Sequence, residues 1–292
     1  MKSRWIINLL MLVIIVGLGS YFYLQPKTQV VASKAYEISQ IKLAEINTIS
    51  LEFPTKAVII FKKDAGEWRM SMPYSARVDQ ESIFHIMSIV AAQSNNKFST
   101  TDLAKFGLDK PKLKLTLNQD TFTFGEFNSV TSEQYVAYKD AVYLLPGSYL
   151  EFASIQINAL LDKSPMAKHE KIVGFDLAKL EQWQELGLNI DLKNSVWTAN
   201  TNKLKINQAA MKEWFEGYWT GMSVSAVEPY KPNLSEKLPS FEVKLADGKR
   251  VHFDKLQESP TLILARPDEG MKYTISADIG FSLLNPPVEA TK

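Results

Sequence analysis

Apolar and polar residues alternate strictly along two stretches of the chain. The alternating apolar positions are Leu113, Leu115 and Leu117 in the first stretch and Phe241, Val243 and Leu245 in the second. A period of two is typical of a strand with one buried face. Each stretch leads through a turn, at residues 118–120 or 246–248, into a further alternating run and two more short apolar runs. The pattern predicts two antiparallel meanders of strands joined by hairpins.

Matched features before and after this pattern recur about 128 residues apart. Each copy has a lone Trp in a strand-like stretch, a helix N-cap residue and a Pro before the alternating strand. These residues are Trp68, Asp79 and Pro111 in the first copy and Trp197, Asn207 and Pro239 in the second. Asp and Asn are favoured N-caps because their side chains accept hydrogen bonds from the first turn of a helix. We therefore predict an internal duplication.

The predicted fold class is α+β, with two tandem repeats that each pack a helix on an antiparallel sheet. We expect one additional helix in the first repeat only, at residues 148–162. In this interpretation the stretch FGLDKP, residues 106–111, closes the connection after the first helix and begins a strand. Pro111 suits the first residue of a strand, because its missing N–H is not needed there.

The N-terminal region has a different character, since residues 5–24 carry no charge. Twenty apolar residues in a helix span a hydrocarbon core of about 30 Å. Lys2 and Arg4 precede this segment, so the positive-inside rule predicts a cytoplasmic N-terminus and an extracytoplasmic body. The alternative is a signal peptide cleaved after Gly19, but the apolar run is longer than is usual for one. We predict a single-pass anchor in the bacterial inner (cytoplasmic) membrane, with the C-terminal part in the periplasm.

These observations divide the chain into five parts. Residues 1–26 form the cytoplasmic N-terminus and transmembrane anchor, and residues 27–42 form a polar tether. The first α+β repeat is expected over residues 43–166 and the second, diverged repeat over residues 167–287. Residues 288–292 are expected to form a short tail.

Charge and composition narrow the class of partner. The net charge is +1, and three of the 33 basic residues lie within the first 27 positions, leaving 30 basic against 32 acidic residues in the body. A body without a basic stripe argues against nucleic acid, whose binding needs clustered Lys and Arg. The chain has no cysteine, which excludes disulfides and thiolate chemistry.

The sequence offers no catalytic or cofactor motif. Its three histidines, His85, His169 and His252, lack the spacing of a metal site. Nucleophile-elbow, phosphate-loop and dinucleotide fingerprints do not occur in it either. We predict a protein that is not an enzyme and that holds no cofactor and no metal. His85 is expected on the solvent side of its helix and His252 on the solvent side of its strand.

Aromatic residues are the remaining candidates for binding. Those considered are Trp68, Trp197, Trp214, Tyr218 and Trp219. The last three lie in the stretch MKEWFEGYWTGM, residues 211–222, and would stack on a sugar ring or hold a partner if they were exposed. Their helical spacing favours core packing instead. Gly217 and Gly221 weaken this helix and predict a kink.

Several of these residues carry a resemblance to a known family. They are Ile46, Ile49, Leu51, Gly66, Trp68, Val78, Asp79, residues 106–108, Pro111, Gly125, Tyr135, Val136 and Tyr143. In this order they resemble the bacterial domain of unknown function DUF4340, over about residues 43–165. The resemblance implies a membrane-anchored extracytoplasmic protein, in some cases associated with ABC-type transport, and it supplies no catalytic residue.

We therefore predict a non-enzymatic, membrane-anchored interaction or scaffolding component, accessory to a transport or envelope complex. Its partners would be the bilayer, through residues 5–24, and other envelope or membrane proteins. The alternative is a ligand-binding module that holds a small molecule or glycan between the two repeats.

Overall fold

The computed structural model describes residues 35–233 and 235–291, together with seven isolated positions between residues 11 and 21. Within the described part of the chain, no helix is long and apolar enough to cross a membrane. The predicted anchor, residues 5–24, falls mostly outside the described residues, and so does the first half of the predicted tether, residues 27–34.

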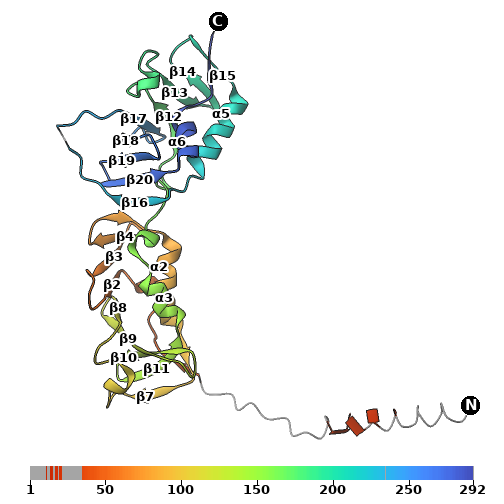
Figure 1. The fold of residues 1–292 in the computed structure, drawn as a ribbon, viewed down its shortest axis with the longest axis vertical. Coiled ribbons are helices and arrows are strands. Elements are labelled where there is room, and N and C mark those ends of the chain that lie inside the picture. The colour runs from red at the N-terminus through yellow and green to blue at the C-terminus, as the bar shows by residue number, and fades with distance from the viewer. Residues whose placement is uncertain are drawn as a thin grey trace, which may run out of the picture.

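Two large antiparallel sheets and short helices make up the described fold, which is α+β (Figure 1). The first sheet has nine strands. In spatial order they are β5 (Ala76–Arg77), β4 (Glu67–Met72), β3 (Ile59–Asp64), β2 (Thr48–Glu52), β8 (Leu113–Leu117), β9 (Asp120–Asn128), β10 (Glu133–Tyr138), β11 (Ala141–Pro146) and β7 (Lys97–Ser99).

The second sheet has eight strands. In spatial order they are β14 (Val196–Ala199), β13 (Asn189–Lys193), β12 (Ile172–Asp176), β17 (Ser240–Leu245), β18 (Arg250–Gln257), β19 (Leu262–Arg266), β20 (Met271–Ile275) and β16 (Ala226–Pro229). Read from β4 and from β14, the two sheets follow the same order of chain connections. This equivalence is consistent with two repeats.

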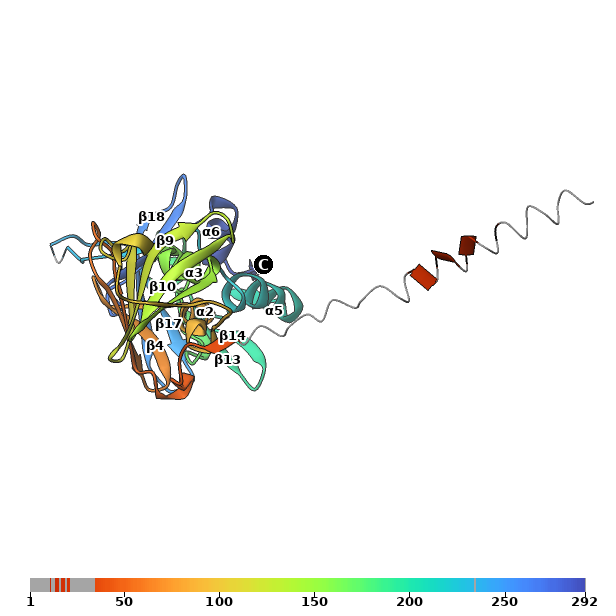
Figure 2. The ribbon, with the colours of Figure 1, turned by 90° about the horizontal axis from the view of Figure 1, so that it is seen from below.

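Helices cover one face of each sheet (Figures 1 and 2). In the first half they are α2 (Gln80–Met87), α3 (Ser148–Ser154) and α4 (Ile157–Leu160), and in the second half α5 (Gln208–Phe215) and α6 (Ala277–Leu284). Asp79 caps α2 by accepting from the Ser82 N–H at 2.9 Å, and Asn207 caps α5 by accepting from the Ala209 N–H at 3.0 Å. Both predicted N-caps are therefore confirmed.

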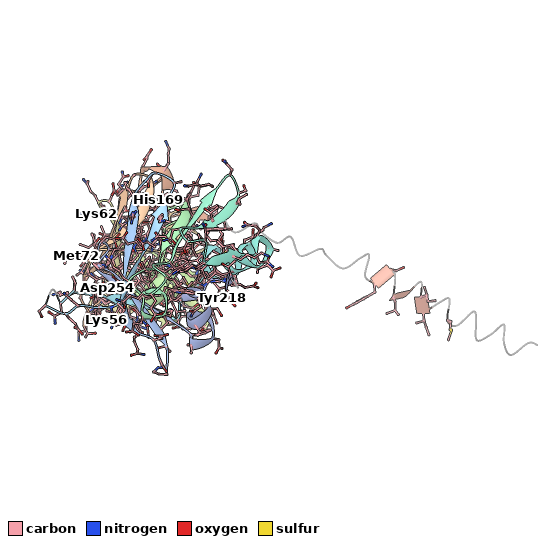
Figure 3. The ribbon with its side chains drawn as sticks, turned by 90° about the horizontal axis from the view of Figure 1, so that it is seen from above. Lys56, Lys62, Met72, His169, Tyr218 and Asp254 are labelled. Atoms are coloured by element: carbon pink, nitrogen blue, oxygen red, sulfur yellow. The ribbon has the colours of Figure 1, made fainter. Side chains whose placement is uncertain are left out.

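The predicted alternation sets the core. The side chains of Leu113, Leu115 and Leu117 are buried, as are those of Phe241, Val243 and Leu245. They pack beneath the helices, and side chains fill the space between strands and helices (Figure 3). The FGL stretch packs separately: Phe106 and Leu108 contact Val142 in a small cluster of their own. Gly107 between them has φ +66°, a left-handed conformation that favours glycine.

Each predicted strand Trp is buried and is held by a glutamine. The Trp68 N–H donates to Gln80 Oε1 at 2.8 Å, and Gln80 Nε2 donates to the Trp68 carbonyl at 2.9 Å. Gln208 makes the same two bonds to Trp197, each at 2.8 Å. The glutamine amide thus takes the place of a neighbouring strand at this point of β4 and of β14.

Several expectations about the ends of the repeats were wrong or incomplete. The helical region after the meander is not confined to the first repeat, because α6 occupies the corresponding place in the second. Within the predicted tether, β1 (Tyr36–Glu37) pairs with β6 (Gln93–Ser94). Within the predicted tail, β21 (Val288–Ala290) pairs with β15 (Leu204–Ile206). Backbone pairing, which composition does not reveal, explains the two differences in the tether and the tail.

We expect the two strand tryptophans to be equivalent core residues. Trp68→Ala and Trp197→Ala should each lower the free energy of unfolding by about 3–5 kcal/mol, because each leaves a cavity under its sheet. Urea unfolding of the full chain would measure this. Lys193→Ala, an exposed position, should change it by less than about 0.5 kcal/mol. A loss confined to one of the two tryptophans would contradict the equivalence.

Candidate functional site

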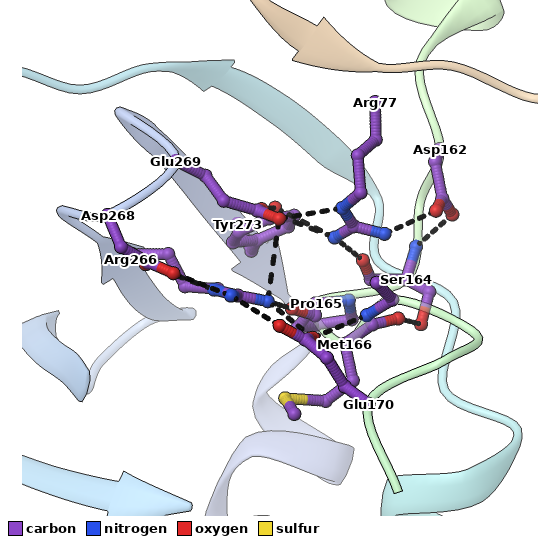
Figure 4. Close-up of polar contacts among 11 residues, drawn as sticks. Arg77, Asp162, Ser164, Pro165, Met166, Glu170, Arg266, Asp268, Glu269 and Tyr273 are labelled. Atoms are coloured by element: carbon purple, nitrogen blue, oxygen red, sulfur yellow. Dashed lines mark hydrogen bonds and ion pairs between the residues drawn. The ribbon is translucent and has the colours of Figure 1, made fainter. Parts of the chain in front are cut away.

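The two halves meet at a buried cluster of charged side chains (Figure 4). They come from both sheets and from the linker between the halves, residues 161–171, which joins α4 to β12. Arg77, on edge strand β5, donates from Nε to Glu269 Oε1 at 2.9 Å. Its other nitrogens reach Asp162, the Ser164 carbonyl at 2.6 Å and the Tyr273 hydroxyl at 3.1 Å. Since Glu269 and Tyr273 belong to the second half, Arg77 ties the first sheet to the second.

Arg266, at the end of β19, makes the complementary set of contacts. Its two terminal nitrogens donate to both carboxylate oxygens of Glu170, each at 2.8 Å, and one also donates to the Pro165 carbonyl at 2.9 Å. It donates further to Asp268 at 2.7 Å. Glu170 and Pro165 lie in the linker, so Arg266 fixes the linker against the second sheet. We call these two arginines and their partners the junction network.

Burial makes the junction network energetically important. The Arg77 and Arg266 side chains are 8% and 2% exposed, and burying an uncompensated charge costs several kcal/mol. Among the described residues no buried side-chain nitrogen or oxygen lacks a hydrogen-bond partner. The network is therefore fully paired, and separating the two halves would leave charges without partners.

The pKa of Glu170 follows from these contacts. Burial alone would raise it, but the hydrogen bonds from Arg266 and from the Ala167 N–H outweigh burial and hold the pKa below its usual value of 4.5. For Tyr273, burial together with Glu269 raises the pKa despite the nearby Arg77. Glu170 is thus held ionised and Tyr273 neutral, and the neutral hydroxyl donates to Glu269 at 2.6 Å.

A cavity of about 340 Å³ lies beside the network. Its walls come from the linker, including Lys168 and Lys171, and from the end of the α5 region, including Phe215 and Trp219. Aromatic and lysine residues therefore line the same space next to the junction.

The aromatic candidates mostly occupy the core. Trp214 and Trp219 are 5% and 3% exposed, and their indole N–H groups donate to the carbonyls of Ser282 and Leu283 on α6. Tyr218, labelled in Figure 3, is half-buried. Residues Glu216–Thr220 form a π-helical turn, which accounts for the irregularity predicted near Gly217. Of the five candidates, Trp219 lines the cavity beside the junction, whereas Trp68 lines a smaller hollow together with Arg77 and Asp162.

The histidines do not form a site. The side chain of His85 is about half exposed, as predicted, but its ring stacks on Phe152 at 4.9 Å. His252 lies 3.0 Å from Asp254 on the outer face of β18. Across the described residues, no group of three or more His, Asp or Glu side chains is arranged to hold a metal ion.

Sequence reasoning missed the residues of the junction network. Neither Arg77 nor Arg266 was singled out, although Arg266 directly follows the apolar run Leu262–Ala265 in the chain. A charged residue that directly follows an apolar strand is expected to be buried and to need charged partners, and this was the one signal in the sequence that pointed to Arg266.

Comparison with protein families matches residues 68–237 to the domain of unknown function DUF4340. The chain belongs to this family. The matched region begins at Trp68 in β4 and ends in the loop before β17, so it extends across the linker into the second half. The range expected from the resemblance, residues 43–165, was therefore too short at its C-terminal end and too long at its N-terminal end. Searches of curated proteins and of solved structures found no match.

The DUF4340 region contains Arg77, Asp162 and Glu170, while Arg266 and Glu269 follow it in the chain. The junction is thus built partly inside and partly outside the matched segment. Nothing in the family description assigns a role to any of these residues.

Arg266→Ala should lower the free energy of unfolding by about 3–5 kcal/mol, because it leaves Glu170 buried without its cation. Arg250 provides a matched control, since its side chain pairs with Glu242 at 2.7 Å but is 54% exposed. Arg250→Ala should cost about 1 kcal/mol or less. Equal losses in the two variants, measured by urea unfolding, would contradict the structural importance of the junction.

The lowered pKa of Glu170 predicts a pH dependence. Its ionised form stabilises the fold above pH 4.5, and this contribution is lost as the pH falls through the lower pKa of the folded state. Glu170→Gln should therefore cost about 3 kcal/mol at pH 7 and progressively less below pH 4.5. Urea midpoints from pH 7 to pH 3 test this. Glu228→Gln, which removes a half-exposed partner of Lys272, should have a small effect throughout, and a pH-independent cost at Glu170 would refute the assignment.

Proposed function

We propose that this DUF4340 protein is a non-enzymatic, membrane-anchored interaction or scaffolding component of the bacterial envelope. Residues 5–24 would hold it in the inner membrane, with the two sheets on the periplasmic side. Its partners would be other membrane or envelope proteins, including a transport complex to which it is accessory.

The junction network is the observation that supports this proposal most directly. Two arginines that are 8% and 2% exposed bind acceptors on the opposite half or in the linker, so both halves form one body. A rigid body can hold binding surfaces at a fixed distance from an anchor, which is what a scaffold requires. The matching strand order of the two sheets supports its origin as two tandem repeats of one unit.

A ligand-binding module is the second candidate, and the cavity beside the junction favours it. The cavity volume of about 340 Å³ is within the range of small-molecule sites. Trp219 and Phe215 would provide apolar contact, and Lys168 and Lys171 would attract an anionic group. In this alternative, the cavity binds a small anionic molecule or glycan beside the linker.

Two measurements on the full chain test the proposal. A reporter active only outside the cytoplasm, fused after Lys292, should be active, and a reporter active only in the cytoplasm should be silent. A tagged chain purified from detergent-solubilised membranes should retain an envelope protein in stoichiometric amount. Cytoplasmic reporter activity would overturn the location. A co-purifying small molecule that native mass spectrometry detects, and that is lost in Lys168→Glu, would favour the alternative.

A further inference from the structure

A cleft on the first half, away from the junction, combines an apolar floor with unpaired cations. It lies between the end of β2 and the start of β8 and has a volume of about 460 Å³. Its lining residues are Glu52, Phe53, Pro54, Lys110, Pro111 and Lys114. We call it the lysine cleft. It contains Lys110 and Pro111 from the FGLDKP stretch, residues 106–111. The other residues of that stretch close the connection before β8.

The floor of the lysine cleft is apolar and rigid. Phe53 is half-buried and packs against the main core from one side. Pro54 and Pro111 flank it, and a proline ring fixes φ and offers no N–H to a ligand. An apolar side chain entering the cleft would therefore meet a preformed surface, with little ordering cost on this side of the contact.

The rim of the cleft is cationic. Lys112, which lies between the two lining lysines in sequence, is neutralised by Glu126 at 2.7 Å. By contrast, within the part of the chain that the structure describes, no carboxylate lies within ion-pairing distance of the Lys110 or Lys114 ammonium group. Lys56, labelled in Figure 3, lies over the Phe53 ring at 5.1 Å and adds a third cation. Glu52, opposite Lys114 across the strand pair, is the one acidic residue in the lining.

The apolar floor and the cationic rim together indicate which class of molecule the lysine cleft binds. Unpaired ammonium groups around an apolar floor complement a group that carries both carboxylates and an apolar side chain. The near balance of 30 basic and 32 acidic residues in the body gives no extended basic track for nucleic acid. A concave site also needs a protruding group to fill it, and the flat surface of a bilayer does not offer one. A protein segment has the protruding side chain and the charge together.

We propose that the lysine cleft binds an acidic, apolar segment of a partner protein. An apolar side chain of the segment lies against Phe53 and Pro111, and its carboxylates lie between Lys110 and Lys114. This inference rests on the proposed function as an interaction component, and it names the surface and the chemistry of the partner.

Site-specific crosslinking in cells that produce the full chain tests the proposal. A photo-crosslinking residue replaces Thr55, which is exposed beside the cleft and is not part of its lining. The expected product is a protein adduct whose linked segment contains both acidic and apolar residues. Lys110→Glu with Lys114→Glu should reduce its yield about fivefold or more, because two attractions become repulsions. The melting temperature of this variant should fall only slightly, since both lysines are exposed and the change at Lys114 places one additional carboxylate opposite Glu52.

The control is Lys203→Glu with Lys205→Glu, two exposed lysines of one strand region in the second half, and it should leave the yield unchanged. An adduct with lipid, an adduct with a segment that lacks acidic residues, or an undiminished yield in the cleft variant would overturn the inference. A crosslinker at Glu185, in the second half, distinguishes failure of the cleft proposal from failure of the proposed interaction role. Protein adducts from position 185 but not from position 55 would refute the cleft alone, whereas their absence at both positions would refute the interaction role as well.

Discussion

The relative position of the two sheets depends on two almost completely buried guanidinium groups. Arg77 and Arg266 approach the junction from opposite halves, and Glu269 lies near both, at 2.9 Å from the first and 3.6 Å from the second. Each charge is stable inside the protein only while its partners stay in place. A small rotation of one half would lengthen several charge-assisted hydrogen bonds at once, so the pairing favours a single arrangement over a range of related ones.

The edges of the sheets follow a related constraint. An edge strand exposes backbone groups that invite pairing with another chain. Gln80 and Gln208 occupy such groups on β4 and β14, while the outer side of β5 is covered by the linker, where Asp162 N–H donates to the Arg77 carbonyl at 3.1 Å. In the second half, β21 covers β15 in the corresponding way. A partner is therefore more readily accepted by side chains in a cleft than by added strands at these edges.

Much of the fold could be predicted from the sequence because it depends on local patterns. The alternation around Leu115 and Phe241 identified strands, and Asp79 and Asn207 identified helix starts, since period and capping are properties of neighbouring residues. A Gln follows each N-cap, at positions 80 and 208. The sequence did not indicate that these glutamines bind the backbone of the strand tryptophans. The junction could not be predicted, because Arg77 and Glu269 are 192 residues apart and no local pattern joins them. The same applies to the lysine cleft, where residues 52–54 meet residues 110–114 only through the pairing of β2 with β8.

In both sheets the strands run across the long axis of the molecule, so the strands follow one another along it from β7 to β14 (Figure 1). Neighbouring strands are spaced about 4.8 Å apart in this direction. The length of the body is therefore proportional to the number of strands that follow one another along this axis. Insertion or deletion of one hairpin would change the distance between the two ends by roughly 10 Å, while leaving the chemistry of each end unaltered.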